Sequence, residues 1–279
     1  MTPILPAATF GSRVFAIALA FIAISSVCNL CNVCYAQRAE HFGREDPPAR
    51  NATSDFPGLF DTNLAAKGTV VGYLPWLSAY WGVTDRLTLG TNLLYALPLV
   101  TGSPGGLISA RYRFYSSPSL QTVLDGIVGG FEIRNKDSNE RSSHSLVLTA
   151  VHTAIALAPE HELTVSVMAG NVALATETST ELTDVALTGL GIGAGYAYFP
   201  THWFAVRAFV LTTPLVAGVA ETNTLRLEAN LSASSGFFQR LLYRAMASFR
   251  LGNHWLLEIG VLGVGVQPLP WLNVGFRIG

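Results

Sequence analysis

Three cysteines have the most regular spacing of reactive side chains in this 279-residue chain. Cys28, Cys31 and Cys34 lie three residues apart, and thiolates at such intervals can bind an iron–sulfur cluster or a zinc ion. The preceding segment argues against a metal site, because it consists of Arg13 and the unbroken apolar stretch Val14 to Ile24. A basic residue, an apolar stretch and then small residues are the order of a secretory signal peptide. We therefore expect no metal and no cofactor at these cysteines.

The small residue Ala36 marks the expected cleavage site, so residues 1–36 are predicted to be the signal peptide. The apolar stretch has 11 residues, fewer than the ~20 that a helix needs to cross a bilayer. Lipidation of Cys28 is a less favoured alternative, because Val27 stands where a small residue is expected. Cleavage after Ala36 gives a mature chain that begins at Gln37 and contains no cysteine.

A second group of residues contains the parts of a hydrolase site. The segment Arg141 to Ser145 includes Ser and His side chains that could act as nucleophile and base, and His152, Glu162 and Asp184 could complete such a site in space. Nothing in it matches the motifs of outer-membrane phospholipases or proteases. We expect His144 at the end of a loop and His152 on a water-exposed surface, either outside the protein or in an aqueous interior, and we do not expect an enzyme.

Arginines form the third group. Arg111 and Arg113 alternate along one segment, and Arg240, Arg244 and Arg250 keep the same parity along another. A ring of arginines favours anions in a channel, whereas single guanidinium groups pair well with carboxylates. Which role applies depends on the elements that position them.

Composition restricts those elements. Half of the residues are hydrophobic, only 13 % are charged, and the mean hydropathy is +0.38. A typical soluble domain has about 25 % charged residues. The mature part nevertheless lacks an uncharged apolar run of 18 residues, so helical membrane spans are not expected. In hydrocarbon every backbone polar group needs a partner, and a closed β-barrel is the alternative that provides one.

Period-two alternation supports the barrel. From Arg240 to Leu251, arginines and other residues on one face alternate with an apolar series on the other. A barrel strand shows this pattern because alternate side chains face lipid and lumen. Further alternating segments begin near Arg86, Ile108 and Trp255. We predict an all-β fold: a transmembrane antiparallel up-and-down β-barrel over residues 57–279, after a flexible periplasmic leader over residues 37–56.

Turn signals give the strand number. Short turns are expected at Gly82 to Asp85, Ser116 to Ser119, Ala158 to Glu160, Phe199 to His202 and Leu251 to Asn253. Longer connections are expected at Thr101 to Gly105, Asn135 to His144, Thr176 to Thr183, Thr213 to Phe237 and Gln267 to Pro270. These connections give eleven strands if the first is Gly68 to Trp81, but chain ends on the same side require an even number. We therefore expect about 12 strands, with the twelfth at Leu59 to Ala65; 10 and 14 remain open. Leu225 to Leu231 is either a strand extension or part of the longest loop, which we expect to fold into the lumen.

The segment from Leu59-Phe60-Asp61-Thr62 through Trp81-Gly82-Val83-Thr84-Asp85-Arg86-Leu87 resembles the opening of uncharacterised bacterial outer-membrane β-barrel proteins that are loosely grouped with porins. The resemblance covers about 35 residues and implies location in the bacterial outer membrane. The chain departs from the usual barrel ending, because it closes on Gly279 rather than on an aromatic residue.

We expect the lumen to carry more arginine than acid and to be a narrow pore for small, preferentially anionic solutes. The residues predicted to line it are Arg86, Arg111, Arg113, Arg207, Arg244, Arg250, Glu162 and Glu258. The alternative is a structural, adhesion or scaffold barrel with a plugged lumen, in which these arginines pair with acids. Expected partners are outer-membrane lipid, the barrel-assembly machinery and, in an open barrel, a small solute. No basic stripe for nucleic acid is present, and the sequence leaves the oligomeric state open.

Overall fold

The alternating segments form thirteen antiparallel strands in the part of the chain that the computed structural model describes. The described residues are 52–53, 55–58, 60–75, 77–95, 103–134, 141–177, 182–222, 226–231, 241–265 and 267–279. These residues belong to the compact unit Pro48–Gly279. The strands are β1 (Val70–Leu74), β2 (Ser78–Gly82), β3 (Leu87–Asn92), β4 (Gly105–Ser116), β5 (Leu120–Arg134), β6 (Arg141–Ala158), β7 (His161–Glu177), β8 (Leu182–Thr201), β9 (Phe204–Thr222), β10 (Arg226–Leu231), β11 (Leu241–Leu251), β12 (Trp255–Val264) and β13 (Gln267–Ile278). The expected signal peptide lies outside the described residues.

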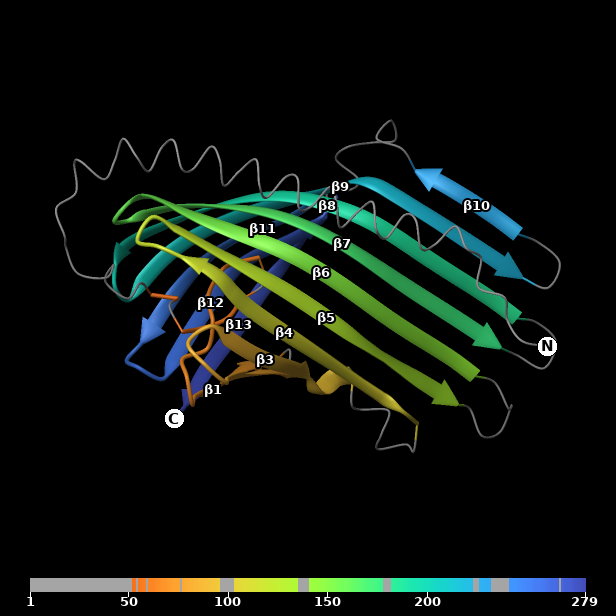
Figure 1. Cartoon of the computed structure of the whole chain (residues 1–279), viewed down its shortest axis with the longest axis horizontal. Helices are drawn as coiled ribbons and strands as arrows, with labels where there is room; N and C mark the ends of the chain where they lie inside the picture. Colours follow the sequence, from red (N-terminus) through yellow and green to blue (C-terminus); the bar gives the residue numbers. More distant parts are fainter. Residues whose placement is uncertain are drawn as a thin grey trace. The chain divides into compact units, whose positions relative to one another are not determined.

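Twelve of the strands close a ring (Figure 1). Strands β1 to β9 pair in sequence order, β11 to β13 follow, and β13 pairs with β1. Strand β9 pairs with β11 along its first half and with β10 along its second half, so β10 lies outside the ring of twelve. The predicted antiparallel up-and-down barrel of about 12 strands is confirmed. Among the described residues, no helix has the length and apolarity to cross a bilayer.

The identity of two strands differs from the prediction. Gly68 to Trp81 was expected to be one strand, but it contains β1, a turn and β2, which pair with each other from Val70↔Trp81 to Tyr73↔Ser78. The predicted strand Leu59 to Ala65 is wrong, since residues 60–65 form no strand. The twelfth strand of the ring therefore comes from the division of the predicted strand Gly68 to Trp81 into β1 and β2.

The outer connections also differ in detail. Thr213 to Phe237 was expected to be a loop folded into the lumen, but β9 continues to Thr222 and β10 returns along it. Leu225 to Leu231 is therefore a strand extension. Gln267 to Pro270 was expected to be a connection, but it forms the beginning of β13.

The outside of the barrel is apolar. Large hydrophobic side chains with about half or more of their surface exposed project from successive strands, among them Ile108, Val128, Val147, Ile259 and Leu272. Exposed aromatic residues gather near the short turns, among them Trp81, Tyr115, Tyr198, Trp203 and Trp255. An apolar band bordered by aromatic side chains is the surface that an outer-membrane barrel presents to lipid.

Candidate functional site

The segment before β1 lies inside the barrel. We call its described residues, 52–53, 55–58 and 60–66, the inner segment. They contact the walls at several strands: Ala52 packs with Phe199 and Ala205 of β8 and β9, Phe56 with Val71 and Leu256 of β1 and β12, Phe60 with Phe209 of β9 and His152 of β6, and the Ala65 amide donates to Thr88 Oγ1 of β3. Only a segment within the ring can contact all of these strands. Ala52, Thr53 and Phe56 are buried, although we expected residues up to 56 to be a leader.

Asp61 is the central polar contact of the inner segment. Its Oδ1 accepts a hydrogen bond from Arg111 Nη1 of β4 at 3.3 Å, and its Oδ2 accepts one from Arg207 Nη1 of β9 at 3.3 Å. The amides of Gly58 and Asn63 donate to Oδ1 at 3.2 and 3.1 Å and fix the carboxylate in place. Since β4 and β9 are separated by four strands of the ring, Asp61 joins two distant walls across the lumen.

Both arginines have a second carboxylate on the wall. Arg111 donates from Nε to Asp125 Oδ2 of β5 at 2.8 Å, and Arg207 donates from Nη2 to Glu258 Oε1 of β12. Asn273 of β13 donates to Glu258 Oε2 at 2.8 Å. A buried charge is tolerated when it is paired and its remaining groups form hydrogen bonds.

Backbone carbonyls of the inner segment satisfy further donors. Arg111 donates from Nη2 to the Gly58 carbonyl at 2.6 Å and from Nη1 to the Asn63 carbonyl at 3.1 Å. Arg113 donates to the Thr62 carbonyl at 3.4 Å. The segment thus replaces water around these guanidinium groups.

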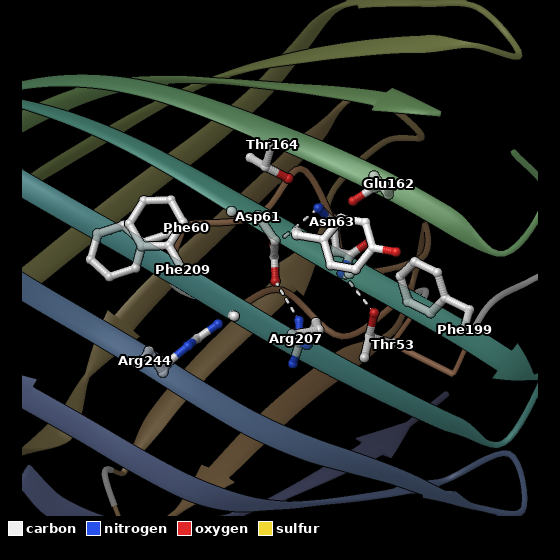
Figure 2. A pocket seen from close by; sticks show the side chains of 14 residues that line it. Thr53, Phe60, Asp61, Asn63, Glu162, Thr164, Phe199, Arg207, Phe209 and Arg244 are labelled. Carbon is white, nitrogen blue, oxygen red and sulfur yellow. Dashed lines mark hydrogen bonds and ion pairs between the residues drawn. The ribbon is translucent and has the colours of Figure 1, made fainter. Parts of the chain in front are cut away.

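A small cavity of about 30 Å³ lies beside Asp61 (Figure 2). It is lined by Glu162 of β7 and by Arg207 and Arg244, whose β9 and β11 are neighbours. Arg244 is buried but forms no ion pair with another described residue. This volume holds about two water molecules and no larger solute. With the inner segment in place, the space beside Asp61 is therefore too small for a larger solute.

An apolar layer borders the cavity. The ring of Phe60 stacks on that of Phe209 with centroids 4.4 Å apart, and His152 meets Phe60 edge-on at 6.5 Å. A hydrogen bond of 2.8 Å joins His152 Nδ1 to Ser166 Oγ on β7. Phe60 thus anchors the segment on the wall without charge.

The structure brings together six of the eight predicted lumen residues. Arg111, Arg113 and Arg207 contact the inner segment, Glu162 and Arg244 line its cavity, and Glu258 pairs with Arg207. Arg250 lies nearer the short-turn end, with its guanidinium 5.8 Å from the ring of Phe56. Arg86 does not join them, because it is exposed in the turn before β3.

The residues that were weighed as parts of a hydrolase site, and not expected to form one, are separated in the structure. His144 and His152 lie eight residues apart on β6, about 26 Å along an extended strand. His144 stacks on Phe131, and Asp184 is exposed on β8. Among the described residues, no group of three or more His, Cys, Asp and Glu side chains is placed to bind a metal ion.

The sequence did not identify Asp61 as a site residue. A signal was present: Pro57 and Gly58 precede it and disfavour a central strand, and Asp61 itself lies two residues before Asn63 in a local side-chain turn. We interpreted the segment as a strand because an even strand number required a twelfth strand before Gly68.

No family model matches this chain, and no curated protein matches it. Solved structures do. The CymD monoaromatic hydrocarbon channel is 11 % identical, with 75 % of this chain and 84 % of that chain covered and a TM-score of 0.35. OmpT of Vibrio cholerae is 11 % identical, with 72 % and 63 % covered and a TM-score of 0.34. The ferric yersiniabactin uptake receptor FyuA of Yersinia pestis is 11 % identical, with 75 % and 41 % covered and a TM-score of 0.31. The closed ring and its apolar outer surface are those of an outer-membrane β-barrel.

Proposed function

We propose that this protein is a gated outer-membrane channel for small solutes, preferentially anionic ones, and that the inner segment is its gate. The observation that carries the proposal is the bridge from Arg111 through Asp61 to Arg207, which spans the lumen between two walls. A carboxylate held by two arginines occupies the position that a solute carboxylate or another small anion takes once the segment leaves.

The charges of the lumen support anion preference in the open state. Among the described residues, six arginines face the interior: Arg111, Arg113, Arg207, Arg244, Arg250 and Arg277. The wall opposes them with three acids, Asp125, Glu162 and Glu258, so its net charge is +3. The inner segment adds two, Asp55 paired with Arg277 and Asp61, and lowers the sum to +1. Departure of the segment therefore leaves an arginine-rich passage, which favours anions.

A permanently plugged scaffold or adhesion barrel is the second candidate. The observation that favours it is the β9–β10 hairpin, which extends beyond the ring on the side of the long loops and offers a surface to a partner. In that role the inner segment would never leave.

A disulfide lock separates the two candidates. Ala65 and Thr88 are in direct contact, with Ala65 N and Thr88 Oγ1 3.0 Å apart, and the mature chain is expected to be free of cysteine. The double variant Ala65→Cys/Thr88→Cys should be closed in planar bilayers when oxidised and should conduct after reduction, with anions more permeant than cations. The two single-cysteine variants are the controls and should not respond to reductant. Equal conductance in both redox states, or no channels in either, would exclude this gate.

A further inference from the structure

The barrel wall is much lower at β1 to β3 than elsewhere (Figure 1). These strands have 5, 5 and 6 residues, whereas β6 to β9 have 17 to 20. A strand needs about 9–11 residues to cross the hydrocarbon layer, and five residues cover about 17 Å. Since β1 begins at the short-turn side, the periplasmic side in such barrels, these strands cover only the periplasmic half of the membrane.

The connection between β1 and β2 has the composition of a membrane-embedded turn. It reads Leu74-Pro75-Trp76-Leu77, and the chain after β3 begins with Leu93 and Leu94. Turns in water favour Gly, Pro, Asn, Asp and Ser. Pro75 fits that preference and the leucines do not, whereas the sequences between β5 and β6 and between β7 and β8, Asn135-Lys136-Asp137-Ser138-Asn139-Glu140 and Thr178-Ser179-Thr180-Glu181, are polar throughout. Leucines at these strand ends therefore indicate that the wall stops within the hydrocarbon.

Strand β13 borders the low wall with an edge along which, among the described strands, only β1 pairs, and only over part of its length. Of its 12 residues, only the five from Val274 to Ile278 pair with β1, so the seven from Gln267 to Asn273 have no strand on that side among the described residues. All ten residues of β12 pair with the other side of β13. The edge lies in the outer half of the membrane, where an unpaired amide is costly.

Two prolines on this edge lower that cost. The amide of Arg277 donates to the His254 carbonyl on the β12 side, so odd-numbered amides of β13 point toward β12 and even-numbered positions face the free edge. Pro268 and Pro270 occupy two of the three even positions above Val274 and carry no N–H. Proline on an edge also prevents another strand from pairing there. The edge is thus adapted to remain open.

At the opposite border of the low wall, on β4, a side chain of β3 gives a hydrogen bond to a backbone carbonyl. Strand β3 pairs with β4 only from Ile108 to Tyr112, which leaves Gly105 to Leu107 above it. The Thr91 hydroxyl donates to the Leu107 carbonyl at 2.6 Å. The Leu107 carbonyl therefore has a hydrogen-bond partner although β3 does not pair with β4 at this position.

We propose that this gap is a lateral portal between the lumen and the outer leaflet. Its borders are the Gln267–Asn273 edge of β13, the ends of β1 to β3, and Gly105 to Leu107 of β4. Its occupants are small molecules with an apolar body that partition into lipid, because both faces of the β13 edge present exposed leucines: Leu269 inward and Leu272 outward, each 55 % exposed. This inference rests on the proposed channel and names its solutes: organic anions with an apolar body, whose carboxylate meets the arginines.

Lipid contact from inside the barrel is the direct test. Bimane is attached to Leu269→Cys, to the far-wall inward position Leu148→Cys on β6, and to the lipid-facing position Leu272→Cys, in vesicles that contain phosphatidylcholine with a nitroxide on the acyl chain. Acyl chains that reach the portal should quench position 269 to at least half the extent found at 272, while position 148 should be quenched several-fold less. Equal weak quenching at 269 and 148 would overturn the portal. If Leu269→Cys does not assemble, Gln267→Cys offers the same inward edge.

A second measurement tests the solute class on the reduced disulfide-lock variant. Decanoate should block its current at concentrations at least tenfold lower than acetate, because only decanoate has an apolar body. Equal block by both acids would refute the proposed class. Quenching without any conductance would refute the channel and leave the portal standing, whereas conductance without quenching at 269 would refute the portal alone.

Discussion

Replacement of Asp61 by asparagine tests the gate with a single atom exchange. Asparagine keeps the shape and an Oδ1 that still accepts the amides of Gly58 and Asn63. It removes the charge that faces Arg111 and Arg207 at 3.3 Å each. The side chain of Asp61 is 11 % exposed, and those of the two arginines are 3 % and 10 % exposed, so solvent replaces little of the lost interaction.

The expected magnitude follows from these contacts. Removal of one partner from a buried ion pair costs about 3–5 kcal/mol. The lower end applies, because Arg111 keeps Asp125 and Arg207 keeps Glu258. About 3 kcal/mol corresponds to a shift on the order of 100-fold, since each ~1.4 kcal/mol is a factor of ten. We therefore expect the ratio of open to closed time to rise by about two orders of magnitude.

Single-channel recording in planar bilayers measures this ratio. Asp85→Asn is the matched control, because it makes the same charge change at an exposed position in the turn between β2 and β3 and should leave the ratio unchanged. Both variants are first checked for the heat-resistant folded form on gels. A folded Asp61→Asn protein whose open-to-closed ratio stays within threefold of the wild type would refute the gate.

Three further outcomes are expected, two from the geometry of the site and one from the sequence. Phe60→Ala removes the stack on Phe209 and, at a cost of about 3 kcal/mol to the closed state, should also raise the open fraction, whereas Phe60→Leu should have a smaller effect in the same recordings. Glu258→Gln leaves Arg207 with one carboxylate fewer and should lower the free energy of unfolding in urea by about 3 kcal/mol; an unchanged unfolding midpoint would contradict the buried pair. Intact mass of the protein from outer membranes should correspond to a chain that begins at Gln37, and a mass that retains the three cysteines would disprove the predicted cleavage.

The strands were predictable where both faces of the wall impose a constraint. Residues Arg240 to Leu251 alternate because lipid contacts one side chain and the polar interior the next, and β11 covers Leu241–Leu251 in register with both neighbours. The arginines could be assigned to the interior from the same pattern. Their pairing with Asp125 and Glu258 could not, because it depends on which positions on different strands are opposite each other.

The inner segment was not predictable by periodicity. Its side chains contact strands on many sides of the lumen at once, so no repeat of two or of 3.6 residues relates them. The need for an even strand number led us to expect a strand here, but the local turn at Asp61 and the preceding Pro57 prevent one. A segment that matches a lumen is constrained by the wall residues it meets, and these are distant in sequence.

The missed turn between β1 and β2 has a different cause, which also supports the portal. Rules for turns assume water around the backbone, and by those rules Pro75 suits a turn whereas Leu74 and Leu77 do not. Leu74, at the start of this turn, is 46 % exposed, and such apolar surface is favourable at the depth of the hydrocarbon but not in water. Pro268 and Pro270 also suit a lipid environment, because they have no amide N–H and water is absent there to bind one at a strand edge. Two segments that are almost 200 residues apart in sequence thus independently indicate that the wall ends inside the membrane.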